Sequence, residues 1–143
     1  RMQGLSKQTW MLMPRIREID AALRPEDQRR IHESHPELVF RGLAGHPLAT
    51  KKRTPEGYDE RLALLEYVAK FPCREAIQQA ASTIRRKDAA LDDFVDACAM
   101  AWVALQIEAG LAQPLPPDPP VDERGLRMEM WWRPMKDVTQ SAK

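Results

Sequence analysis

An excess of charge of one sign and a long apolar run are both missing from this sequence. Its 143 residues carry 22 basic and 21 acidic side chains, so no overall field attracts the protein to nucleic acid or to an anionic membrane, and any such binding must be local. Even the apolar stretch at residues 97–107 is well short of the about 20 residues that cross a membrane. The first residues also lack a signal-peptide pattern. We therefore expect one folded core and no membrane partner.

Cysteine and histidine are too few and too scattered to predict a zinc site. Cys73 and Cys98 lie in separate predicted helices, without CxxC spacing and without a histidine at metal-ligand spacing. The three histidines, His32, His35 and His46, do not form a ligand motif either. The simplest interpretation is a reduced, cytoplasmic protein.

Three aspartates stand at the start of an otherwise apolar helix, in the run Asp92-Asp93-Phe94-Val95-Asp96-Ala97. Residues three and four apart share a helix face, so either Asp93 and Asp96 or Asp92 and Asp96 can present oxygens to one point. Two carboxylates are half of a Mg²⁺ site, because this ion is commonly held by one or two carboxylates with waters and substrate phosphates. The alternative is that Asp92 and Asp93 only complement the positive end of the helix dipole.

The spacing of apolar residues predicts helices at residues 6–23, 36–41, 54–70, 74–86 and 90–110, and strands at residues 30–34 and 126–132. Pro14 either kinks the first helix or begins it. Pro36 begins the second helix and Gly42 ends it, and Glu33 lies at the carboxyl end of the first strand. Five prolines in residues 114–120 predict a stiff linker between a core at residues 1–113 and a strand and tail at residues 121–143. A sheet with so few strands can be completed by a second copy of the chain, through a sheet edge or the carboxyl-terminal strand.

A basic triplet, Lys51-Lys52-Arg53, lies in the loop before the helix that Thr54 and Pro55 begin. It either forms a solvated loop or delivers local positive charge to a phosphate. The second interpretation makes nucleic acid a candidate partner.

Five short motifs, taken in chain order, resemble one known family. They are Gly4-Leu5-Ser6-Lys7-Gln8 with Pro14-Arg15-Ile16, then Glu33-Ser34-His35-Pro36-Glu37 with Phe40, then Lys51-Lys52 with Gly57 and Arg61, then Asp92-Asp93-Phe94-Val95-Asp96-Ala97, and finally Asp122-Glu123-Arg124-Gly125-Leu126-Arg127-Met128-Glu129. Together they resemble the predicted RNase H-like nucleases of domain of unknown function 429, from Gly4 to about Trp132. The helix with Asp93, Asp96 and Ala97 is also similar to the last catalytic helix of RuvC-type Holliday junction resolvases.

The resemblance implies an α/β, partial RNase H-like fold that is mostly helical with few strands. It implies a nuclease that hydrolyses phosphodiesters with Mg²⁺ or Mn²⁺, in which Glu33, Asp93 and Asp96 are the catalytic carboxylates and the metal ligands. The first strand of the family carries a further aspartate, and neither this strand nor its aspartate has a counterpart in this sequence. The resemblance therefore implies that the chain is a carboxyl-terminal portion of the fold and is inactive as it stands.

The resemblance also implies roles around the metal. Asp92 or Glu37 is expected to orient bound waters, and His35 to transfer protons near neutral pH. The residues expected to contact phosphates are Lys51, Lys52 and Arg61.

Two other functions are compatible with the sequence. One is a non-catalytic helical interaction module that forms a homodimer, which agrees with the near-zero net charge. The other is a hydrolase of nucleotides or other small phosphate esters, which the same carboxylates can serve. The sequence does not separate DNA, RNA, junction and nucleotide substrates.

Overall fold

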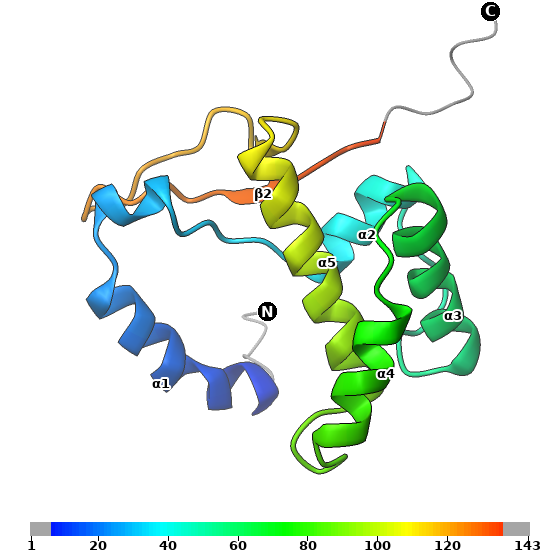
Figure 1. Cartoon of the computed structure of the whole chain (residues 1–143). Coiled ribbons are helices and arrows are strands. Elements are labelled where there is room, and N and C mark those ends of the chain that lie inside the picture. The colour runs from blue at the N-terminus through cyan, green and yellow to red at the C-terminus, as the bar shows by residue number, and fades with distance from the viewer. Residues whose placement is uncertain (1–6, 136–143) are drawn as a thin grey trace, which may run out of the picture. The chain divides into compact units, whose positions relative to one another are not determined.

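Helices make up most of the described chain, and each of its two strands has three residues. The computed structural model describes residues 7–135 (Figure 1). Its elements are α1 (Lys7–Ala22), η1 (Pro25–Arg29), α2 (Pro36–Ala44), α3 (Pro55–Ala63), η2 (Leu64–Val68), α4 (Arg74–Thr83), α5 (Leu91–Glu108), β1 (Gln113–Leu115) and β2 (Met130–Trp132). This content confirms the predicted α/β class with many helices and few strands. No helix in the described residues is long and apolar enough to cross a membrane.

The chain divides into two units. The smaller unit comprises Arg1–His32 and Pro120–Met128, and the larger unit comprises Glu33–Pro119 and Glu129–Lys143. Strand β1 begins just before the predicted linker at residues 114–120 and includes its first two residues. The predicted linker boundaries stay a prediction.

In the smaller unit, α1 confirms the predicted first helix, with Pro14 inside it rather than at its first turn. Arg124 links the Pro120–Met128 segment of this unit to the end of α1. Its guanidinium donates to the carbonyl oxygens of Asp20 and Leu23 and lies 2.9 Å from the Asp20 carboxylate. The apolar side chains of α1 are largely exposed, Trp10 by 68% and Ile19 by 64%.

The larger unit is built around α5, whose buried residues recur at the helical period. They are Asp92, Val95, Ala99, Trp102 and Val103. This stripe packs into one core with buried side chains of α2, α3, η2 and α4, namely Val39, Phe40, Leu43, Leu62, Leu65 and Ile77, and with Cys73. Burying such a set of apolar side chains is the main stabilising term of a small domain. The first turn of α5, with Asp92, therefore lies at one end of a rigid core.

Both predicted helix starts at a proline are confirmed. The His35 ring precedes α2 and its Nδ1 accepts the N–H of Glu37 at 3.2 Å, while the Thr54 hydroxyl precedes α3 and accepts the N–H of Gly57 at 3.2 Å. The predicted end of the second helix at Gly42 is wrong, because α2 continues to Ala44 and Gly45 follows with φ of 77°. Gly42 is instead buried where the carboxyl-terminal segment passes, and a Cβ there would lie 2.4 Å from the Arg133 carbonyl oxygen.

The predicted strand at residues 30–34 is wrong, since these residues form no ladder. Their end makes a local contact with β2, in which the Glu33 carbonyl accepts the N–H of Trp131 at 2.7 Å and the Ser34 hydroxyl donates to the Trp131 carbonyl at 2.7 Å. The predicted strand at residues 126–132 is confirmed only at its end, as β2. Strand β2 pairs antiparallel with β1, with Pro114 opposite Trp131.

Candidate functional site

The candidate site lies at the amino-terminal end of α5. Asp92 is three residues before Val95 and seven before Ala99, so it continues the buried stripe and its residue is only 8% exposed. Asp96 follows one turn later on the same face and is partly buried. The packing of α5 therefore holds two carboxylates side by side at the edge of the core.

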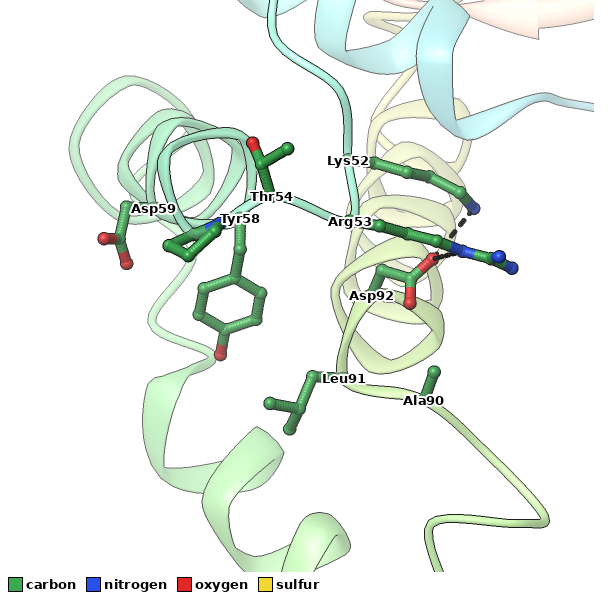
Figure 2. Close-up of a pocket in the computed structure, with 9 residues that line it drawn as sticks. Lys52, Arg53, Thr54, Tyr58, Asp59, Ala90, Leu91 and Asp92 are labelled. Carbon is green, nitrogen blue, oxygen red and sulfur yellow. Dashed lines mark ion pairs between the residues drawn. The ribbon is translucent and has the colours of Figure 1, made fainter.

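The basic loop before α3 supplies the opposing charges. Lys52 Nζ lies 2.7 Å from Asp96 Oδ2 and 3.3 Å from Asp92 Oδ2, and Arg53 Nε lies 3.7 Å from Asp92 Oδ2. Figure 2 shows both cations extending from the loop toward Asp92. The Lys52 side chain is 37% exposed and that of Arg53 is 80% exposed, so both side chains are accessible from solvent.

The two carboxylates favour the protonated, positively charged form of Lys52. The hydrogen bond to Asp96 is the largest of the effects that raise the pKa of Lys52 above its usual value, against a smaller opposing effect of burial. Two buried oxygens, Asp96 Oδ1 and Asp92 Oδ2, accept no hydrogen bond, although Asp92 Oδ2 takes part in the ion pairs described above. A buried carboxylate oxygen without a donor is costly. Lys52 and Arg53 already compensate Asp92 Oδ2, so the oxygen that a further cation would stabilise is Asp96 Oδ1.

Asp93 points away from this pair. It occupies the third position of α5, where its Oδ2 accepts the N–H of Ala90 at 2.8 Å, and its residue is exposed. It thus caps the helix and complements the dipole. Of the two pairs that helical spacing allows, Asp92 and Asp96 share the ion pairs with Lys52.

The other predicted site residues lie in separate surroundings. Glu33 is exposed, and Lys51 is exposed with its carbonyl accepting from Thr54. The Nδ1 atom of His35 accepts the N–H of Glu37. Among residues 7–135, no group of three or more His, Cys, Asp or Glu side chains is arranged to hold a metal ion, and this includes the set predicted as ligands. Their catalytic and metal-binding roles stay predictions.

Arg61 is buried, with a side chain only 4% exposed, and it pairs with Glu37. Its Nε donates to Glu37 Oε1 at 3.2 Å, and Nη2 donates to Oε1 at 2.9 Å and to Oε2 at 3.0 Å. Nη1 donates to the Gly57 carbonyl at 3.0 Å and to the Thr50 hydroxyl at 3.3 Å, and Nη2 reaches the Thr50 carbonyl at 3.3 Å. The guanidinium is thereby fully engaged within the protein.

A pocket of about 700 Å³ opens beside Asp92, between the first turns of α3 and α5 (Figure 2). Its lining residues are Lys52, Arg53, Thr54, Pro55, Tyr58, Asp59, Ala90, Leu91 and Asp92. Tyr58 and Leu91 both line it, and in Figure 2 the hydroxyl end of the Tyr58 ring is the end closer to Leu91. The pocket therefore joins an apolar, aromatic hollow to the charged cluster.

Nothing in the sequence indicated Tyr58 as a pocket residue. Helical spacing left Asp92 and Asp93 as alternatives, and the family resemblance selected Asp93 with Asp96 as ligands and Asp92 as a residue that orients water. A signal for Asp92 was present, because counting back from Ala99 by four and then three residues leads through Val95 to Asp92. No local signal identifies Tyr58, because the pocket needs α3 and α5 to pack together.

Comparisons with curated proteins and with solved structures found no match. The model of one family, described as protein of unknown function (DUF429), matches residues 1–121. Because this match spans most of the 143 residues, the chain belongs to the DUF429 family.

Proposed function

We propose that the protein is a metal-dependent nuclease of the RNase H-like type, which hydrolyses phosphodiester bonds of a nucleic acid in the cytoplasm. The observation that carries this proposal is the pair Asp92 and Asp96, which lie on one face of α5 against Lys52, with Asp96 Oδ1 buried and without a hydrogen-bond donor. An acidic pair beside cations, at an accessible pocket, suits a ligand that combines metal and phosphate charge.

The donor chemistry fits Mg²⁺ or Mn²⁺. Both ions prefer oxygen ligands, and Mg²⁺ needs only one or two carboxylates when waters and phosphates complete its shell. Asp96 and Asp92 would hold the ion. The family resemblance also implies Glu33 and Asp93 as ligands, but Asp93 would first have to release the Ala90 N–H that it accepts. When bound, such an ion would supply an activated water and would stabilise the leaving oxygen.

The basic residues bind the substrate in this proposal. Lys52 holds the two carboxylates together through its ion pairs, and its ammonium can turn from them to a phosphate oxygen when another cation neutralises the pair. Arg53 contributes a second, more exposed charge. We assign this role to Lys52 and Arg53, together with Lys51, rather than to Arg61, whose donors are engaged within the protein. His35 would transfer protons through Nε2, because its Nδ1 caps α2.

Single aspartate-to-asparagine variants test the proposal. Mn²⁺ binding is measured by titration calorimetry for Asp92→Asn, Asp93→Asn and Asp96→Asn, with Asp88→Asn as control because Asp88 pairs only with Arg85 on the surface among the contacts described. We expect Asp96→Asn and Asp92→Asn to weaken Mn²⁺ binding by about 10-fold or more, and Asp88→Asn to leave it unchanged.

Cleavage is then measured on the longest natural form of the protein with labelled DNA and RNA, single-stranded and duplex. Asp96→Asn is expected to abolish Mn²⁺-dependent cleavage while the helical circular dichroism stays the same. Full cleavage by this variant would refute the metal assignment. Cleavage of nucleotides alone would favour a small phosphate-ester hydrolase.

A second candidate function is a non-catalytic helical interaction module. It is favoured by the exposed apolar side chains of α1, among them Trp10, Met11 and Ile19. Light scattering tests it through the predicted homodimer, since Ile19→Glu would dissociate a dimer formed through this helix.

A further inference from the structure

The pocket between α3 and α5 has two chemically different sides. Pro55, Tyr58, Ala90 and Leu91 give it an apolar wall, and Lys52 and Arg53 lie on the side of Asp92. Its volume of about 700 Å³ is within the range of small-molecule sites. The metal-site proposal uses the charged side only and gives the apolar wall no role.

We propose that this pocket receives a nucleobase between Tyr58 and Leu91, and that the adjoining phosphate lies against Lys52 and Arg53. The inference rests on the proposed function and adds a base-binding subsite to it. Tyr58 is the residue that stacks on the base.

The Tyr58 ring is held in a suitable position. It packs against the hydrophobic core at one side, and burial raises the pKa of its hydroxyl, while the ring also lines the pocket. A ring fixed in this way offers a preformed face for stacking, which any base can use. Leu91, which is 49% exposed and also lines the pocket, would contact the base from the α5 side.

The charges fix the direction of the ligand. Asp59 is exposed on the α3 side of the pocket and repels a phosphate there. Lys52 and Arg53 attract it on the other side, and the 3.7 Å ion pair of Arg53 with Asp92 is long enough to exchange for a phosphate at little cost. The phosphate is thereby brought next to Asp92 and Asp96.

The test uses a trinucleotide with a central 2-aminopurine, whose fluorescence falls when the base stacks. It is carried out in EDTA, where Lys52 keeps its ion pairs with Asp92 and Asp96 and the exposed Arg53 meets the phosphate, so that stacking on Tyr58 is measured without metal. Tyr58→Leu keeps an apolar side chain and removes the ring, and we expect it to weaken binding about 10-fold. Tyr58→Phe should bind as the wild type does. Tyr67→Leu is the matched control, because Tyr67 is the other tyrosine of the chain, is 69% exposed and does not line the pocket.

Equal binding by wild type and Tyr58→Leu, or equal losses in Tyr58→Leu and Tyr67→Leu, would overturn the inference. If Tyr58→Leu loses its helical circular dichroism, Leu91→Trp gives a second test, since the larger side chain at an exposed position fills the pocket and should abolish quenching. Binding of 2-aminopurine riboside monophosphate as tight as that of the trinucleotide identifies a free nucleotide as the ligand, and weaker binding identifies a strand. Because the assay excludes metal, its outcome is independent of the Mn²⁺ titrations.

Discussion

Replacing Arg61 by methionine is expected to lower the free energy of unfolding by about 3 kcal/mol. A guanidinium has five N–H donors, and Arg61 directs its donors to Glu37, Thr50 and Gly57. The guanidinium carbon of Arg61, Cζ, also lies 5.6 Å from the centre of the Phe40 ring. Methionine keeps much of the apolar packing and removes every one of these hydrogen bonds.

The magnitude follows from the burial of the two partners. Breaking a buried ion pair typically costs about 3–5 kcal/mol, because the remaining charge is left without a partner. Here the remaining partner is Glu37, whose side chain is 43% exposed and can be hydrated, so the low end of that range applies. Lysine at position 61 should restore little, since one ammonium cannot reproduce the two-pronged contact.

Urea unfolding followed by tryptophan fluorescence measures this loss, with Trp102 as a buried reporter in α5. With a slope of about 2 kcal/mol per molar, the midpoint should fall by about 1.5 M. Arg41→Met is the control, because Arg41 is exposed on α2, and it should change stability by less than about 0.5 kcal/mol. A midpoint for Arg61→Met within 0.3 M of the wild type, on the order of the error of such fits, would refute the structural role of Arg61.

Two further predictions concern the core and the site. Gly57→Ala should lower the free energy of unfolding in urea by about 1–3 kcal/mol, because the new Cβ would lie 2.0 Å from the Lys51 carbonyl oxygen. This loss is expected although alanine has the better helix propensity. Gln78→Ala, at an exposed position of α4, is the control and should leave stability unchanged. Burial raises the pKa of the Cys73 thiol from 9.0 to about 12, so the folded thiol stays protonated where the unfolded one ionises, and stability present below pH 9 is lost as pH rises toward 12. Between pH 8 and pH 10, the free energy of unfolding should decrease by about 1 kcal/mol less in Cys73→Ala than in the wild type. An equal decrease in the two proteins would contradict this prediction.

The helices were largely predictable because their signals are local. Thr54 with Pro55 and His35 with Pro36 begin helices by capping and by the fixed φ of proline, and neither depends on distant residues. The end of α2 was not predictable in the same way. Gly42 resembles a helix stop in sequence, but it is glycine because the chain near Arg133 passes over it.

The candidate site was partly predictable. Helical spacing alone limited the acidic pair to two choices, and the loop with Lys52 was recognised as a source of charge. That Lys52 contacts Asp96, 44 residues away, depends on the packing of α3 against α5. The same packing forms the pocket at Tyr58.

The sequence by itself determined the helical content, the helix starts and the family of the chain, because periodicity, capping and short motifs are read from neighbouring residues. Only the tertiary structure decided which aspartate faces Lys52, that Arg61 is enclosed with Glu37, and that Gln113–Leu115 pairs with Met130–Trp132. These features join segments far apart in the chain. Burial of apolar surface stabilises these arrangements, and the cost of desolvating charged groups requires that they be paired. Both effects depend on the packed core rather than on local sequence.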